Sequence, residues 1–258
     1  MGNHFKKFKE LHNQSEPLLI GNVWNVQSAK KMENLGFTTI GTSSYAIAET
    51  LGYADGEEMS FEEYLFIIKR IAASVTLPLS VDLEAGYGKT PEEIVANIKE
   101  LYKIGVSGIN IEDSIVESGV RTIIDAEIFA KKINSVVELL LKEKIEVFIN
   151  LRSDVFLLGM PDSLIEAKKR ISLYENTGVD GLFFPCVTKI EDIAILTKAT
   201  KLPINVMCMP DLPDFKTLQN AGVQRISMGN FLNSKIYQYL ESEIETIVKN
   251  QDFRSIFS

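Results

Sequence analysis

Histidine and cysteine are scarce in this sequence of 258 residues. The two histidines, His4 and His12, both lie in the first twelve residues, so the rest of the chain has none. This argues against hydrolases of the Ser-His-Asp or Cys-His type and against a zinc site built on imidazole. The two cysteines, Cys186 and Cys208, lack metal-type spacing and are expected to be reduced thiols in or near the core. Acid–base or metal chemistry therefore falls to Asp, Glu, Lys, Arg, Tyr, Ser or water.

Long apolar runs and an excess of positive charge are also missing. No stretch of eighteen apolar residues is present to form a transmembrane helix, and the N-terminal segment lacks the apolar core of a secretory signal. The net charge of −8 argues against binding to nucleic acid or to an anionic membrane surface. We expect a cytoplasmic protein that acts on a small molecule.

Eight short runs rich in Ile, Leu, Val and Phe alternate with amphipathic stretches along the chain. Several runs are apolar throughout, which is typical of parallel strands buried on both faces. They are Pro17–Gly21, Phe37–Thr42, Pro78–Leu83, Gly108–Glu112, Ile145–Asn150, Gly181–Pro185, Pro203–Met207 and Arg225–Met228. Eight such repeats in about 250 residues predict an α/β protein with a single (β/α)8 barrel of the TIM type. No GxGxxG motif follows the first run, so a dinucleotide-binding fold is less favoured.

Start and stop signals delimit the helices expected between these runs. Ser60 with Glu63 predicts a capping box, and Thr90 followed by Pro91 predicts an N-cap with proline at the first helical position. Glycines stand between a helix and the next run at the four positions 36, 105, 178 and 222, where a C-cap needs a positive φ. The expected helices are Asn25–Leu35, Ser60–Ser74, Thr90–Ile104, Asp125–Lys142, Ser163–Asn176, Lys189–Ala199, Asp214–Ala221 and Asn233–Asn250. We expect one barrel domain over residues 1–258, with an N-terminal arm and a C-terminal helical tail over residues 233–258.

Carboxylates gather where the runs end, and the carboxyl ends of barrel strands carry the functional groups of such enzymes. Asp82 and Glu84 stand two residues apart, so their side chains share a face, and Glu112 follows the neighbouring run. Three converging carboxylates without histidine form an oxygen-only set that suits Mg²⁺, or Mn²⁺, rather than zinc. The alternative is that these acids pair with nearby Lys or Arg side chains or cap helices.

Hydroxyl and guanidinium groups follow two other runs. Ser43, Ser44 and Tyr45 offer hydroxyls and backbone amides that suit a carboxylate or a phosphoryl group, although they could equally cap the strand end. Arg152 lies at an otherwise apolar strand end. A buried arginine there needs an anion, which is either a neighbouring carboxylate or that of a substrate.

Three further residues are candidates for the lining of a substrate pocket. Gly86, which precedes Tyr87, permits close approach of the backbone, although a glycine of this kind is also common in a simple βα turn. Trp24 is the single tryptophan and follows the first run. It could line the pocket or cover its rim.

Four blocks of sequence together resemble the isocitrate lyase / phosphoenolpyruvate mutase superfamily. They are GTSSYAIAETLGYADGE (Gly41–Glu57), VDLEAGYG (Val81–Gly88), GINIEDS (Gly108–Ser114) and INLRSDVF (Ile149–Phe156). The resemblance extends from about Leu19 to Met228. It is strongest toward the short phosphonomutase-like and 2-methylisocitrate-lyase-like branch.

The resemblance implies an enzyme that binds Mg²⁺ and a 2-oxo or 2-hydroxy carboxylic acid and passes through an enolpyruvate-like form. It makes Asp82 the principal metal carboxylate, with Asp55, Glu84 and Glu112 around the water shell of the ion. Substrate binding would fall to Trp24, Ser43, Ser44, Tyr45, Gly86, Tyr87 and Arg152. Arg152, Asp55 and Glu112 would be the catalytic residues, because Mg²⁺ and Arg152 stabilise charge that develops on the enolate oxygen.

The loop after the fourth run departs from the family pattern. The carbon–carbon lyases of the family carry a catalytic Cys on this loop, and the phosphonopyruvate-forming mutases carry a Lys. Residues 114–122 read SIVESGVRT and contain neither. Oxaloacetate-type decarboxylation, cleavage of a substituted malate and phosphorus–carbon chemistry, as in a phosphonomutase or a phosphonopyruvate hydrolase, all stay open. A barrel that binds a carboxylate without turning it over is a further alternative.

The C-terminal tail carries apolar residues at helical spacing. They are Phe231, Leu232, Ile236, Tyr239, Leu240, Ile244, Ile247 and Val248. Packing on the chain's own barrel is one possibility. The resemblance implies instead that this last helix is exchanged with a neighbouring subunit in a homo-oligomer, usually a tetramer.

Overall fold

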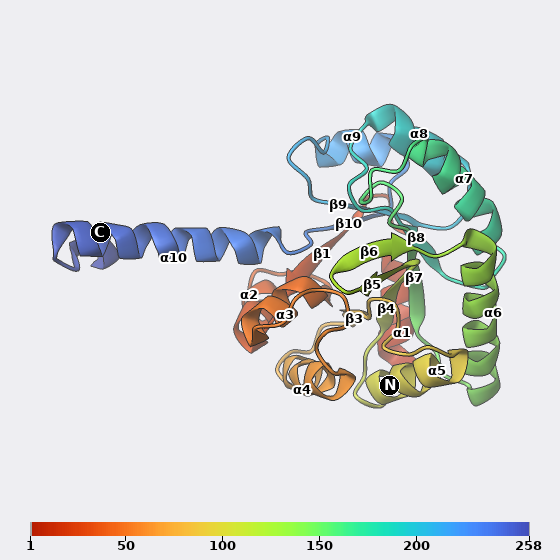
Figure 1. Cartoon of the computed structure of the whole chain (residues 1–258), viewed down its shortest axis with the longest axis horizontal. Helices are drawn as coiled ribbons and strands as arrows, with labels where there is room; N and C mark the ends of the chain where they lie inside the picture. Colours follow the sequence, from red (N-terminus) through yellow and green to blue (C-terminus); the bar gives the residue numbers. More distant parts are fainter. Residues whose placement is uncertain (1, 258) are drawn as a thin grey trace.

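The computed structural model describes residues 2–257, and it describes the side chains of residues 4–257. Eight parallel strands close into a barrel in the order β1-β10-β9-β8-β7-β4-β3-β2 (Figure 1). They are β1 (Leu18–Val23), β2 (Ile40–Thr42), β3 (Leu79–Asp82), β4 (Gly108–Glu112), β7 (Phe148–Arg152), β8 (Gly181–Phe183), β9 (Ile204–Met207) and β10 (Arg225–Ser227). Each overlaps one of the eight predicted runs, so the (β/α)8 prediction is confirmed.

Seven helices that follow strands cover the outside of the barrel. They are α2 (Val26–Asn34), α4 (Phe61–Ala72), α5 (Pro91–Lys103), α6 (Ala126–Glu143), α7 (Ser163–Tyr174), α8 (Ile190–Lys198) and α9 (Phe215–Asn220). Both predicted N-termini form capping boxes, with Ser60 accepting from the backbone of Glu63 and Thr90 accepting from that of Glu93. The four glycines between helices and strands have φ between 82° and 89°, as their C-cap role requires.

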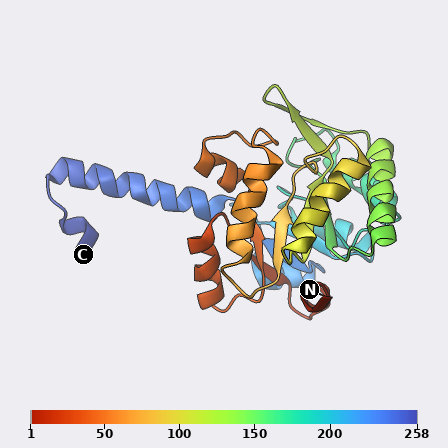
Figure 2. The same ribbon diagram turned by 90° about the horizontal axis from the view of Figure 1, so that it is seen from below.

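Three elements were not expected from the sequence. They are α1 (Gly2–Leu11), the short α3 (Ser44–Leu51) directly after β2, and a hairpin of β5 (Ser114–Glu117) and β6 (Val120–Ile123). Ser118 and Gly119 connect the hairpin strands and both have positive φ, at 52° and 76°. This matches the two-residue turn that suits the twist of a hairpin. The Ser-Gly pair was the available signal in the sequence. In Figure 2 the hairpin projects beyond the barrel.

The expected N-terminal arm is instead the helix α1, which closes the amino-terminal end of the barrel. Phe8 and Leu11 of α1 form a small apolar cluster with Leu18, Ile20 and Phe148. A Cβ atom on Gly108 of β4 would lie 2.7 Å from the ring of Phe8, so only glycine admits the helix this closely. The cluster places α1 at the end of the barrel opposite the carboxyl ends of the strands.

His12 belongs to this closure and is almost fully buried. Its ring stacks on Phe148 with centroids 4.1 Å apart, and Nδ1 lies 2.9 Å from the carbonyl oxygen of Phe8. Burial, assisted by the nearby Arg225, lowers the pKa of His12 to about 3. The imidazole is therefore neutral in the folded protein at any physiological pH.

We expect acid to destabilise the protein through His12. Between pH 6.5 and 3 the unfolded chain binds a proton at this ring and the folded chain does not, so stability present above pH 6.5 is lost as pH falls. The expected loss is about 1.4 kcal/mol per pH unit in that window. Urea unfolding at pH 7, 6 and 5 measures this slope. The variant His12→Leu should reduce the dependence of the unfolding free energy on pH. The control variant His4→Leu, at an exposed site, should not. An unchanged slope in His12→Leu would assign the acid sensitivity to other groups.

The last helix, α10 (Phe231–Asn250), leaves the barrel and projects from it, and a short 3-10 helix (Arg254–Phe257) follows (Figures 1 and 2). It begins two residues before the predicted start. Of its side chains only Asn233 is buried. No helix within residues 2–257 is both long and apolar enough to cross a membrane.

Candidate functional site

A cavity of about 500 Å³ opens at the carboxyl ends of the barrel strands. Six of the residues singled out in the sequence line it, namely Ser43, Ser44, Tyr45, Asp55, Asp82 and Arg152. They come from the ends of β2, β3 and β7 and from the loop between α3 and α4. The structure therefore brings together side chains that are more than 100 positions apart in the chain.

The backbone of Asp82 is fixed from both sides. The hydroxyl of Thr42 accepts from the Asp82 amide at 2.9 Å, and the hydroxyl of Tyr64 donates to the Asp82 carbonyl at 2.8 Å. The carboxylate accepts from the Ser44 hydroxyl at 2.9 Å and lies 3.4 Å from the Asn110 side-chain nitrogen. Among the described residues Asp82 forms no ion pair. Its negative charge is thus left for a cation or a proton.

The amino end of α3 faces this carboxylate. Ser43 is the N-cap, its hydroxyl accepting from the Ala46 amide at 3.3 Å. The Ser44 amide points toward Asp82 at 3.5 Å. The free amides of a first helical turn carry partial positive charge, so this end of α3 attracts an anion.

Arg152 is held by carboxylates. Its Nη1 lies 2.9 Å from Glu112 Oε2, and its Nε donates to Asp154 Oδ1 at 2.6 Å. Glu112 and Asp154 are buried, and burial makes such charges costly unless they are paired. For Glu112 the structure bears out the pairing alternative considered for the acids at strand ends.

A second arginine, Arg121 of the β5–β6 hairpin, reaches into the same cluster. Its guanidinium pairs with Asp55 Oδ2 at 2.6 Å and with Asp154 Oδ2 at 3.2 Å, and it also contacts Glu112. The hairpin packs closely on the loop that holds Asp55, because a Cβ on Gly56 would lie 2.4 Å from Val116. The hairpin therefore covers this cluster of carboxylates.

Glu84 lies beside this cluster, on the VDLEAGYG segment (Val81–Gly88) that resembles the family. Its carboxylate accepts from the Glu57 amide at 2.7 Å and from the Tyr87 hydroxyl at 2.9 Å. Burial raises the pKa of Glu84 to about 8, and the charge of Asp55 adds to the rise. Glu84, Tyr87 and Glu57 all have positive φ, at 51°, 52° and 62°. Backbone strain of this kind concentrates at functional sites.

The donor chemistry of the site suits a hard divalent cation. Within residues 2–257 no three of the His, Cys, Asp and Glu side chains form a group that could hold an ion directly. Asp82 nevertheless carries an unpaired charge, and Asp55 Oδ1 is buried without a hydrogen-bond partner among the described residues. These two groups fit an ion that keeps most of its water, which is how Mg²⁺ usually binds.

Five predicted site residues do not line this cavity. Glu84 and Glu112 line a smaller hollow of about 200 Å³ beside the hairpin. The other three are Trp24, Gly86 and Tyr87. Trp24 is nearly buried and lines a separate hollow between α2 and the start of α10. Tyr87 stacks on Tyr64 with centroids 5.5 Å apart, and Gly86 packs on α5, where a Cβ would lie 2.8 Å from Ile94. The structure places them behind the site, where Tyr87 supports Glu84. Their contact with a substrate stays a prediction.

Four residues of the site were not among the predicted site residues. Arg121, Asp154, Asn110 and Arg225 all lie in or against the cluster. The signal for Arg225 was the same as for Arg152, a charged residue in an apolar strand. Both cysteines were expected in or near the core. Cys186 is partly buried and lines the cavity, whereas Cys208 is exposed.

Comparison with known proteins gives matches along most of the chain. A family model described as phosphoenolpyruvate phosphomutase matches residues 8–248. An uncharacterized protein of Mycobacterium tuberculosis strain H37Rv is 31% identical over 86% of this chain and 81% of its own length. An oxaloacetate decarboxylase of Bradyrhizobium sp. strain BTAi1 is 30% identical over 71% of this chain and 64% of that enzyme. A solved structure from Burkholderia cenocepacia J2315, described as a phosphonomutase, is 31% identical, with a TM-score of 0.87 over 94% of this chain and 99% of that one.

The barrel and the charged site at its strand ends define a (β/α)8 enzyme. The chain belongs to the phosphoenolpyruvate phosphomutase family, within the isocitrate lyase / phosphoenolpyruvate mutase superfamily. This confirms the resemblance seen in the sequence. It also confirms that the protein is an enzyme of the lyase or mutase type.

Proposed function

We propose that the protein is a Mg²⁺-dependent lyase that acts on a small 2-oxo or 2-hydroxy carboxylic acid through an enolpyruvate-like intermediate. The observation that carries the proposal is the meeting of three groups in one cavity. They are the amino end of α3, the unpaired carboxylate of Asp82 and the guanidinium of Arg152. An anion-binding helix end opposite a cation and an arginine suits a substrate whose carboxylate is fixed while charge develops on a neighbouring oxygen.

Each residue has a distinct part in this proposal. The Ser43 hydroxyl and the amides of Ser44 and Tyr45 bind the substrate carboxylate. Asp82 holds the divalent cation, and Asp55, Glu84 and Glu112 orient its water. When bound, the cation supplies positive charge beside the enolate oxygen. Arg152, kept rigid by its two carboxylates, would stabilise the same developing charge.

The hairpin bears on which reaction is performed. It has no Cys, Lys or His, so Arg121 and Ser114 are the polar side chains that it directs at the carboxylates. This favours decarboxylation of an oxaloacetate-like acid, in which carbon dioxide leaves without a protein acid on the leaving group. The similarity to an oxaloacetate decarboxylase supports this choice. The phosphomutase family model keeps phosphorus–carbon chemistry as the second candidate.

A pyruvate-release assay tests the proposal. Oxaloacetate, substituted malates, 2-methylisocitrate and phosphonopyruvate are each incubated with the protein and Mg²⁺, and a parallel set contains excess chelator. We expect pyruvate from an oxaloacetate-like acid in the presence of the metal only. Conversion of phosphonopyruvate alone, either to pyruvate and phosphate or to phosphoenolpyruvate, would favour the second candidate. No product from any acid, despite binding of oxalate, would favour a barrel that binds without catalysis.

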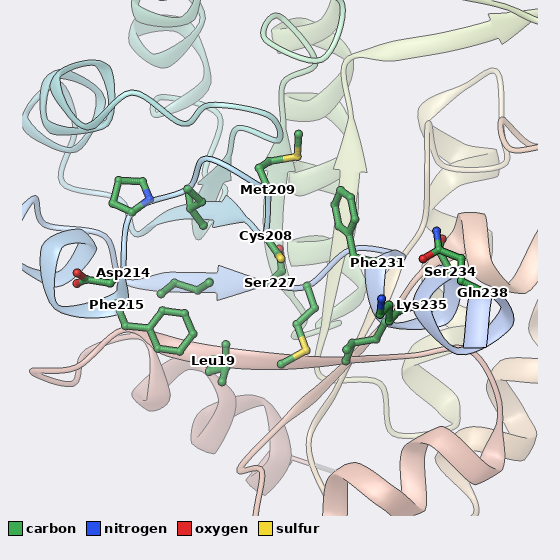
Figure 3. A pocket seen from close by; sticks show the side chains of 15 residues that line it. Leu19, Cys208, Met209, Asp214, Phe215, Ser227, Phe231, Ser234, Lys235 and Gln238 are labelled. Atoms are coloured by element: carbon green, nitrogen blue, oxygen red, sulfur yellow. The ribbon is translucent and has the colours of Figure 1, made fainter. Parts of the chain in front are cut away.

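The position of α10 suggests the oligomeric state. This helix projects from the barrel with apolar residues exposed along it, among them Ile236, Leu240, Ile244 and Val248 (Figure 1). A largely apolar cavity of about 700 Å³ lies at the amino end of this helix, between the helix and the ends of β9 and β10 (Figure 3). An isolated helix is marginally stable in water, and most helical stability comes from packing of its apolar face. We propose that α10 packs on a second copy of the chain, in a dimer or tetramer with exchanged helices.

We expect light scattering after size exclusion to give a mass of at least two chains. The variant Ile236→Asp/Leu240→Asp/Ile244→Asp should release monomers, because each new charge would have to be buried without a partner. Ser242→Asp, on the same helix, is the matched control and should keep the wild-type mass. A wild-type monomer at micromolar concentration would contradict the exchanged helix.

A further inference from the structure

Arg225 is a third guanidinium that lines the site cavity, and its environment differs from those of Arg121 and Arg152. Those two are paired with buried carboxylates. Arg225, the first residue of β10, is 2% exposed and forms no ion pair with any described residue. Its Nη2 lies 3.2 Å from Asn110 Oδ1 and 3.5 Å from the Ser80 hydroxyl. Its Nε and Nη1 have no hydrogen-bond partner within residues 2–257.

An unpaired guanidinium inside a barrel is costly. Moving such a charge from water into the interior is strongly unfavourable, and natural cores rarely contain one without an anion. Burial is the main reason that the pKa of Arg225 falls to about 9, so the group still carries its charge at neutral pH. The fold therefore keeps a positive charge that no carboxylate of residues 4–257 neutralises through direct contact.

The surroundings of Arg225 direct this charge toward the cavity. Below it the ring of Phe8 closes the barrel, with its centroid 5.8 Å from the guanidinium carbon. Beside it, Asn110 links it to the site: the amide oxygen accepts from Arg225, while the amide nitrogen lies 3.4 Å from Asp82 Oδ1. Arg225 and Asp82 are thus separated by one amide group. Arg225 lines the cavity, so an anionic group that enters past Asp82 approaches its guanidinium.

We propose that Arg225 binds a second anionic group of the substrate, a carboxylate or a phosphonate, at the floor of the cavity. The inference rests on the proposed function, in which the first carboxylate is held at the amino end of α3. It assigns specificity: the preferred acid is a dianion, with one charge bound at the helix end and the other at Arg225. A guanidinium with two free nitrogens suits the paired oxygens of either group.

Binding of three matched acids tests the inference without turnover. Malate, 3-phosphonolactate and 2-hydroxybutyrate share the 2-hydroxy acid and end in a carboxylate, a phosphonate or a methyl group. Calorimetric titration is performed in buffer with Mg²⁺. We expect the wild-type protein to bind malate or phosphonolactate roughly 10- to 100-fold more tightly than 2-hydroxybutyrate, since a hydrogen bond to a charged group contributes on this scale. The comparison of malate with phosphonolactate identifies which anionic group fits.

Two substitutions at the same position assign the preference to Arg225. Arg225→Met removes the charge and keeps the aliphatic part of the side chain. We expect its affinity for the dianions to fall to that for 2-hydroxybutyrate. Its affinity for 2-hydroxybutyrate should stay within about threefold of the wild-type value. Arg225→Lys should keep part of the preference. Without ligand, Arg225→Met should melt at the wild-type temperature or above it, because it removes an unpaired buried charge.

Several results would overturn the inference. They are equal wild-type affinity for the three acids, an equal loss for all of them in Arg225→Met, or a fall in melting temperature of the unliganded variant, which would make Arg225 a structural group. These results are distinguishable from failure of the proposed function. A preference that depends on Arg225, without pyruvate release from any acid, would leave the inference standing and remove the lyase activity.

Discussion

Asp82→Asn is expected to lower turnover roughly a thousand-fold, while the fold stays intact. The carboxylate of Asp82 receives its contacts from Ser44 and Asn110, both neutral. The amide of asparagine has nearly the same shape, and its oxygen can keep the contact with the Ser44 hydroxyl. What the substitution removes is the negative charge. If that charge holds the cation beside the enolate oxygen, both metal affinity and rate should fall together.

Two measurements separate this result from a folding defect. Turnover of the acid that responds in the pyruvate assay gives the rate, and electron paramagnetic resonance of Mn²⁺ gives metal binding independently of turnover. Glu10→Gln is the matched control, because Glu10 is an exposed acid on α1 at the opposite end of the barrel. Asp82→Asn that retained a tenth of the wild-type rate, or bound Mn²⁺ with wild-type affinity, would refute the assignment of Asp82 as the metal carboxylate.

The barrel was predictable because its signals are local. Each strand is marked by a short run that contains Ile, Leu, Val or Phe, and helices are marked by caps such as Thr90 and Ser60 within one turn. Elements without such signals were missed. The apolar residues of α3 directly follow those of β2. Those of α1 stand at helical spacing, but they are few in a segment rich in lysine.

The site was predictable in its residue types but not in its pairings. Asp82, Ser44 and Arg152 could be placed at one end of the barrel from the strand order alone. The partner of Arg152 could not be predicted. Glu112 is 40 positions away, and a substrate carboxylate was an equally suitable partner for the same guanidinium. Arg121 and Asp55 are 66 positions apart and meet only because the hairpin folds over the loop. Long-range ion pairs depend on tertiary packing, and the hydrophobic periodicity of a sequence does not predict which distant residues come into contact.

Asp113 belongs to the GINIEDS block (Gly108–Ser114), but its contacts stabilise the fold and are not part of the proposed reaction. It follows Glu112 in the sequence but turns outward, away from the cavity, and is fully buried. One oxygen accepts from Arg170 at 2.8 Å and from the Tyr174 hydroxyl at 2.9 Å. The other accepts from the Asp154 amide at 2.9 Å. This ion pair fastens α7 to the loop that carries Asp154, a direct partner of Arg152.

The largest loss of stability is therefore expected from Arg170→Met, at about 3–5 kcal/mol, because it leaves the Asp113 charge buried without its partner. Urea unfolding measures it, and Arg70→Met, an exposed arginine on α4, is the control expected within about 0.5 kcal/mol of wild type. The double variant Arg170→Met/Asp113→Asn removes both charges. It should recover a large part of the loss, since the cost comes from the unpaired charge and not from the missing contacts. If the double variant were as unstable as the sum of its two single variants, Asp113 and Arg170 would act independently, and packing of the arginine stem would explain the effect.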